Sequence, residues 1–190
     1  MRRIQTNPIV IMTSNPPTLR NMRMNKYIAQ FAKYLETDDW QFKLEKHQGD
    51  GREFLRAGWK GRNTRLDLVL DSREESDLAM CFVYLPVQVP EDRRAAVAEL
   101  ICRLNYRFHV GHLDLDFNDG EVRFRQSIDM EGGELTETMI SNMIYTALGT
   151  CDDYFAVIMS VAFGGKNAME ALQEPEREAE PEAEETGTLQ

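Results

Sequence analysis

The stretch DLAMCFVYLP, from Asp77 to Pro86, restricts the possible folds of this chain more than any other feature. Side chains of a β-strand alternate between its two faces, and here both faces are apolar from Leu78 to Leu85. Such a strand is typical of the centre of a sheet that is covered on both sides. Helices can cover one side. The other side predicts a second layer, which could be the N-terminal segment, another subunit or a bound partner.

The residues before this stretch alternate between apolar and polar, which predicts three consecutive antiparallel strands. The sequences HQGDG and GRN separate them and are typical of turns. The apolar positions predicted to share one face are Trp40, Phe42, Leu44, Leu55, Ala57, Trp59, Leu66, Leu68 and Leu70.

Three segments instead have apolar residues at the spacing of an amphipathic helix. The first runs from a cap at Thr18 or Asn21 to about Thr37, and the second begins at Pro90. The third begins after a cap at Thr136 and stops at residues 164–165, a glycine pair. The predicted order is α-β-β-β-β-α-β-β-α. Because strands cluster instead of alternating with helices, the fold class is α+β with an antiparallel sheet.

The stretch HLDLDFNDGEVRFRQ, residues 112–126, could be a calcium loop or a β-hairpin. A calcium loop needs glycine at position 119 and glutamate at position 125, where the chain has Asp119 and Arg125. A two-residue turn at Asp119 and Gly120 explains the pattern better. The pairs this register predicts are Phe117 with Val122, Leu115 with Phe124, Asp116 with Arg123 and Asp114 with Arg125.

Charge is unevenly distributed along the chain, whose net charge is −10. Residues 1–35 contain six basic residues and no acidic one, whereas residues 173–190 contain seven glutamates and a single arginine. We predict a flexible basic arm at 1–17, one domain at 18–172 and a disordered acidic tail at 173–190. An acidic body repels phosphates, so nucleic-acid binding is disfavoured except through the basic arm.

The sequence predicts a cytoplasmic protein. Its apolar run PIVIM is too short for a secretory signal, and no apolar run approaches the roughly 20 residues of a membrane span. The cysteines, Cys81, Cys102 and Cys151, are odd in number and lie among apolar residues. We therefore expect them to be buried and reduced.

No motif predicts a catalytic, metal or cofactor site. His109 and His112 would lie on opposite faces of a strand, which disfavours a shared metal. The sequence FGGK lacks the spacing of a phosphate-binding loop. Asp152 and Asp153 have no accompanying acid or base, and we expect them on the exposed face of the last helix.

Four residues are candidates for binding a protein partner. Arg93 and Arg94 could bind an acidic partner, although pairing with nearby acidic residues explains them as well. Trp40 and Trp59 could anchor a peptide, since interface hot spots favour tryptophan. Packing against the core is the alternative for both, because tryptophan is mostly buried.

Two long segments, VPEDRRAAVAELICRLNYRFHVGHLDLDFNDGEVRFRQSI and CDDYFAVIMSVAFGGKNAMEAL, resemble the YbjN family, described as bacterial sensory transduction regulators. The resemblance covers roughly residues 38–172. The features that carry it are Pro90, Glu91, Arg93, Arg94, Asn105, Gly111, Gly120, Tyr154, Gly164, Gly165 and Lys166. It implies a fold similar to class I type III secretion chaperones, a twisted antiparallel sheet with helices on one side. Those chaperones are small acidic homodimers that hold partly unfolded segments of partner proteins.

The resemblance implies no established enzymatic activity. Together with the doubly apolar strand, it leads us to expect a non-catalytic, dimeric protein-binding module, a chaperone-like adaptor or regulator. The alternatives are an enzyme with an unrecognised site and a nucleic-acid-associated regulator that uses the basic arm.

Overall fold

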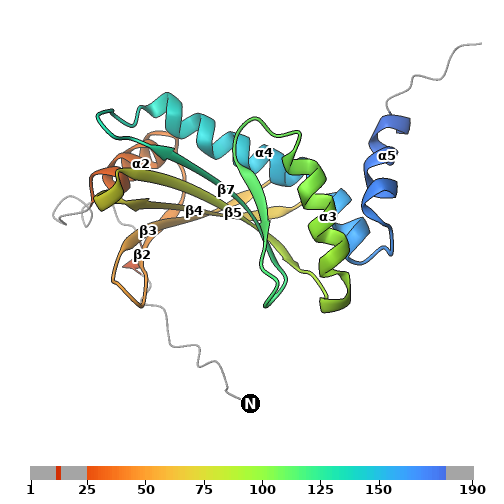
Figure 1. Cartoon of the computed structure of the whole chain (residues 1–190). Coiled ribbons are helices and arrows are strands. Elements are labelled where there is room, and N and C mark those ends of the chain that lie inside the picture. The colour runs from red at the N-terminus through yellow and green to blue at the C-terminus, as the bar shows by residue number, and fades with distance from the viewer. Residues whose placement is uncertain (1–11, 14–24, 179–190) are drawn as a thin grey trace, which may run out of the picture.

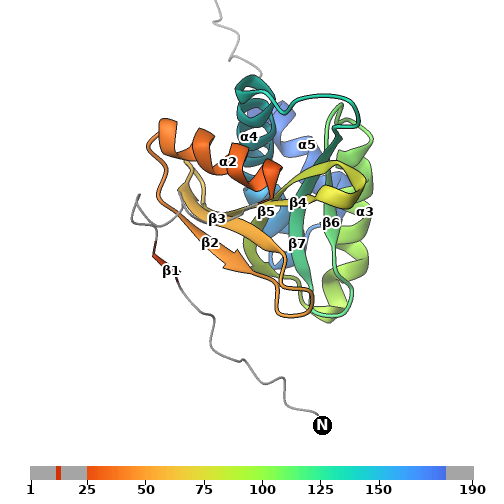
Figure 2. The ribbon, with the colours of Figure 1, turned by 90° about the vertical axis from the view of Figure 1, so that its left-hand side faces the viewer.

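The computed structural model describes residues 12–13 and 25–178, with side chains for residues 25–173. They form a seven-stranded antiparallel sheet in the order β1-β2-β3-β4-β5-β7-β6, with the helices packed on one of its faces (Figures 1 and 2). The strands are β1 (Met12–Thr13), β2 (Phe42–Lys46), β3 (Glu53–Lys60), β4 (Arg65–Arg73), β5 (Leu78–Gln88), β6 (His112–Leu115) and β7 (Glu121–Asp129). The helices are α2 (Lys26–Thr37), α3 (Arg94–Asn105), α4 (Glu137–Ala162) and α5 (Ala168–Glu178), with short 3-10 turns at Glu74–Ser76 and Glu91–Arg93.

The predicted α+β class and element order are confirmed, and the structure adds an element at each end. β1 pairs with the outer edge of β2, and α5 continues to Glu178, through residues 173–178 of the predicted acidic tail. The first helix begins later than predicted. Its cap is Asn25, whose side chain accepts from the backbone N–H groups of Tyr27 and Ile28, whereas Thr18 and Asn21 lie outside the described residues. The rest of the predicted arm also lies outside them, apart from β1.

The core lies between the sheet and the helices, on the face that the period-two pattern predicted. Cross-strand pairs such as Leu55 with Leu70 and Leu68 with Val83 point toward α2 and α4. Burying each such side chain stabilises the fold by roughly 1.5–3 kcal/mol. The fully buried strand residues on this face are Leu55, Leu68, Leu70, Ala79, Cys81, Val83, Val122 and Phe124.

Polar side chains attach the helices to the ends of the sheet. Asp77, which has a left-handed backbone, accepts at 2.6 Å from both Lys26 Nζ and Tyr27 Oη and so holds the start of α2. At the end of α3, Asn105 donates to the Leu113 carbonyl at 3.0 Å and accepts from its N–H at 2.8 Å. The side-chain amide makes the same pair of hydrogen bonds to Leu113 that the backbone of a neighbouring strand would make, and it fixes α3 against β6.

The β6–β7 hairpin forms, but the predicted register is wrong by two residues. Leu115 pairs with Val122 and Asp114 with Arg123, so the connection is a four-residue loop instead of a two-residue turn. The Asp116 carboxylate accepts from the backbone and side-chain N–H groups of Asn118, which favours the longer loop. A shift of two leaves the side chains of β6 and β7 on their predicted faces, whereas Phe117, predicted to pair with Val122, lies in the loop and is exposed.

Asp152 and Cys102 are not where the sequence predicted them. Asp152 is buried, and its carboxylate accepts from the backbone N–H groups of Arg62, Asn63 and Thr64 at 3.0–3.1 Å. It thus joins α4 to the β3–β4 turn, a contact between distant segments that helical periodicity does not reveal. Cys102 is exposed, unlike the two buried cysteines.

Candidate functional site

The two faces of β5 differ in their environment. Ala79, Cys81, Val83 and Leu85 are at most 4% exposed beneath the helices. The alternate residues Leu78, Met80, Phe82 and Tyr84 are only half-buried, and the described part of the chain places no helix over them (Figure 2). The prediction that β5 is central is confirmed, since it lies between β4 and β7. A second covering layer is not present among the described residues.

We call this second side of the sheet the open face. At its centre, Met80, Phe82 and Tyr84 of β5 lie beside Val69 of β4, which pairs with Phe82. Arginines from neighbouring strands partly cover the apolar surface: Arg123 Cζ lies 5.1 Å from the centre of the Phe82 ring. A cation over an aromatic face is stabilising, but a partner can displace it. The arginine side chains therefore cover the apolar residues only in part.

On one side of this apolar centre lies the buried carboxylate of Asp71. It accepts from Arg52 Nη1 at 3.2 Å and lies 3.2 Å from His47 Nε2. The His47 ring in turn contacts the Phe54 ring, with the centroids 4.6 Å apart.

On the other side, Asp114 of β6 lies within 3.4 Å of the guanidinium groups of Arg123 and Arg125. His112 Nε2 accepts from Arg125 Nε at 3.1 Å. In both clusters an arginine holds the carboxylate beside the histidine, as in an ion-pair network. If the histidine were a general base, the carboxylate would instead orient its ring toward a reacting group.

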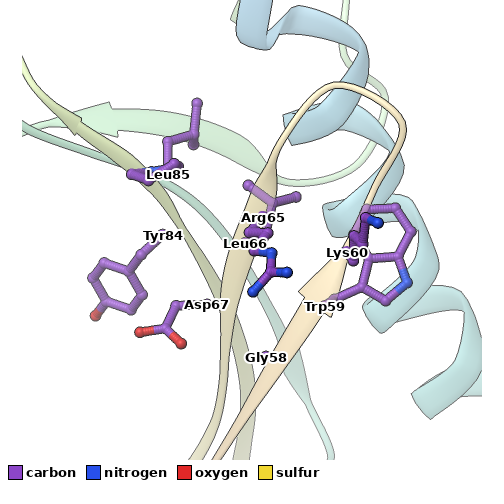
Figure 3. Close-up of a pocket in the computed structure, with 9 residues that line it drawn as sticks. Gly58, Trp59, Lys60, Arg65, Leu66, Asp67, Tyr84 and Leu85 are labelled. Atoms are coloured by element: carbon purple, nitrogen blue, oxygen red, sulfur yellow. The ribbon is translucent and has the colours of Figure 1, made fainter.

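A groove crosses the open face over β2 to β5. It consists of a hollow of about 630 Å³, lined by Lys60, Arg65 and Tyr84 among others, and a neighbouring hollow of about 340 Å³ that reaches Lys43. Both are lined by Gly58 and Asp67. We call this surface the Gly58 groove, and Figure 3 shows the larger hollow, whose residues come from three neighbouring strands.

The larger hollow lies where β4 and β5 separate. Their pairing ends at Asp67 and Tyr84, although β5 continues for four more residues to Gln88. Beyond Tyr84, β5 is irregular against β7 too, with a register shift between Tyr84 and Gln88. Pro86, which cannot donate a backbone hydrogen bond, lies in this irregular part and lines the hollow.

The two predicted tryptophans both pack against the core. Trp40 donates to Asp38 at 3.0 Å, and its ring centroid lies 6.3 Å from that of Tyr145. Trp59 is also among the residues that line the larger hollow of the Gly58 groove (Figure 3), while its side chain lies on the core side of the sheet, like that of its cross-strand partner Leu66.

The two predicted arginines contact backbone carbonyls instead of the nearby acidic residues that were the alternative explanation. Arg93 donates to the carbonyls of Val161 and Lys166 at 2.7 Å and so holds the end of α4. Arg94 donates to Val89 and Phe117, and thus to the β6–β7 loop. Both guanidinium groups serve internal contacts, and neither lies in the Gly58 groove.

Sequence reasoning missed Gly58 and the cations around it. A glycine inside a strand was the available signal, because it weakens the strand and often marks a close approach of another backbone. Among the described residues, no cluster of three or more metal-ligating side chains occurs. No helix in this described part is long and apolar enough to cross a membrane.

A family model described as "Putative bacterial sensory transduction regulator", YbjN, matches residues 28–159. The chain belongs to the YbjN family. The match begins in α2 and ends within the last turn of α4, so it includes every strand of the open face except β1. The family that the sequence resembled is thereby confirmed.

One chain of the crystal structure of the ExsC-ExsE complex is similar to this YbjN chain. The TM-score is 0.45 and the identity 15%, over 68% of this chain and 88% of that one. No curated protein matches the chain.

Proposed function

We propose that this YbjN protein is a non-catalytic, cytoplasmic protein-binding module, a regulator that contacts its partner through the open face. One observation carries the proposal. The half-buried apolar side chains of Met80, Phe82 and Tyr84 lie at the centre of the sheet, where a partner can bury them. Apolar surface at the centre of a patch with a polar rim is typical of protein interfaces.

The rim of the open face supports the same proposal. Asp71, Asp114 and the arginines around them form ion pairs that frame the apolar centre. A charged rim around an apolar centre gives an interface its specificity and its association rate. The proposal includes a homodimer, in which a second copy of the chain binds this face.

The test is affinity capture from native lysate with the full chain and two variants. Phe82→Glu places a charge at the centre of the open face. Tyr106→Glu, the matched aromatic control, changes a residue that is 93% exposed beyond α3, on the helical side. We expect Phe82→Glu to lose the captured partner and Tyr106→Glu to keep it, with unchanged thermal unfolding in both.

Equal retention of the partner by the two variants would contradict this role for the open face. Light scattering on the same proteins tests the dimer. A mass corresponding to one chain at all concentrations would remove the homodimer from the proposal.

A further inference from the structure

We propose that the Gly58 groove binds an extended, acidic segment of another protein. This inference rests on the proposed function and names the chemistry of the partner at one end of the open face. It is carried by three observations: unneutralised cations, a strand glycine that the fold does not need, and a hollow that runs across the strands.

The groove is locally positive in a chain whose net charge is −10. The two carboxylates that line it, Glu45 and Asp67, share one arginine, Arg56, at 3.5 Å and 3.0 Å, so these three groups together carry one net negative charge. Lys43, Lys60 and Arg65 remain, and within the described part of the chain none of their side chains makes an ion pair or hydrogen bond.

The positions of these cations favour an anion between them. Lys60 and Arg65 are directly opposite each other on β3 and β4, where like charges repel. An acidic side chain placed in the hollow that both residues line would relieve that repulsion. Because the rest of the chain is acidic, such a partner would be attracted here and repelled elsewhere, which gives specificity for this site.

Gly58 supplies the space for a partner's backbone. A Cβ added at Gly58 would meet no atom within 4 Å, and its backbone lies outside the left-handed region that favours glycine. Neither internal packing nor backbone conformation therefore requires glycine at this position. Glycine in a strand weakens it and is typical of a place where another backbone comes close to the sheet.

The shape of the groove fits an extended segment. It reaches from β2 to β5, across three strand spacings of about 4.8 Å, which corresponds to roughly four extended residues. In an extended segment, alternate side chains point to the same side, so acidic residues at every second position can face Lys43, Lys60 and Arg65.

The test uses two labelled probe peptides, one of alternating Glu and Tyr and one of alternating Lys and Tyr, with the full chain in fluorescence anisotropy. We expect the Glu-Tyr peptide alone to bind, and its binding to weaken as salt is added. Lys60→Glu combined with Arg65→Glu should weaken it by roughly tenfold or more. Arg103→Glu combined with Arg107→Glu makes the same charge change near the end of α3 and should leave binding unchanged.

A second pair of variants tests the space above Gly58. Gly58→Val introduces a side chain that suits a strand and fills the groove, so it should abolish binding while thermal unfolding stays unchanged or improves. Gly149→Ala in α4 is the matched control, because a Cβ there also meets no atom within 4 Å. It should bind the peptide as the wild type does.

Three results would overturn the inference: equal binding of both peptides, no binding of either, or unchanged binding by the groove variants. If Phe82→Glu still loses the lysate partner in those cases, the proposed function stands and only the acidic segment is wrong. Light scattering of the groove variants provides the remaining check. A loss of self-association in them, with peptide binding intact, would identify a second copy as the binder and contradict the proposal.

Discussion

At the scale of single residues, Asp152 shows how one side chain can connect two distant segments. Its carboxylate, on α4, accepts three backbone N–H groups from the β3–β4 turn at residues 62–64. Such a site stabilises the negative charge, and the turn depends on the carboxylate in return because the buried Asp152 oxygens accept its backbone N–H groups.

We therefore expect Asp152→Asn to lower the free energy of unfolding by about 2–4 kcal/mol, because the amide turns an N–H donor toward backbone donors. The control is Asp153→Asn. Asp153 is well exposed and pairs with Arg62 at 2.8 Å, so its loss should cost about 0–1 kcal/mol. Urea denaturation of the two variants measures the difference, and equal effects would show that the buried contact is unimportant.

The pH dependence gives this prediction a second readout. Burial alone would raise the pKa of Asp152, but the N–H donors of Asn63, Thr64 and Arg62 outweigh it and hold the pKa below its usual value of 3.8. The stabilisation is thus complete above the unfolded-state pKa and is lost as the pH falls through the lower folded-state pKa. The difference in the free energy of unfolding between wild type and Asp152→Asn should therefore become smaller as the pH falls below about 4.

At the scale of elements, the β6–β7 hairpin shows what a sequence pattern can and cannot specify. Alternation determined the face of each residue, because a register shift of two preserves that face. The loop length depended on hydrogen bonds from Asn118 to Asp116, and on the contact between Gly120 and Val89, the residue directly after β5. Val89 is distant in sequence, so the pattern around the hairpin could not include it.

Gly120 is the residue on which that packing depends. Its φ is 85°, and an added Cβ would lie 2.2 Å from the Val89 carbonyl oxygen. We expect Gly120→Ala to lower the free energy of unfolding by about 2–4 kcal/mol through backbone strain and this clash together.

The matched control for this prediction is Gly132→Ala. Gly132 also has a positive φ, 71°, but an added Cβ would meet nothing within 4 Å. Gly132→Ala should therefore lower the free energy of unfolding only by the backbone strain, about 1–2 kcal/mol. Thermal unfolding of both variants separates the two contributions. A Gly120→Ala variant no less stable than Gly132→Ala would mean that the approach of Val89 is unimportant.

At the scale of the whole molecule, the sequence predicted the sheet, its helices and the central place of β5. It did not predict the uncovered second face of that strand. An apolar strand has the same pattern whether a helix, another subunit or a transient partner covers it, so periodicity cannot distinguish these cases. The Gly58 groove was missed for a similar reason, since it depends on which cations remain unpaired after folding.

The sheet order also predicts where the molecule is most stable. β5 lies between two long strands, β4 and β7, and α4 packs over it. By contrast, β6 is a short edge strand, and α5 contacts α3 and α4 at the outer end of the helical layer (Figure 1). Local opening costs least where few buried contacts are lost.

In native-state hydrogen exchange we expect the amides of Cys81 and Val83 to exchange most slowly, near the rate of global unfolding. Amides of β6 that face solvent and those of α5 should exchange by local opening at lower denaturant. If α5 proved as protected as β5, the chain would unfold as a single unit with no separable end, and this gradient would be wrong.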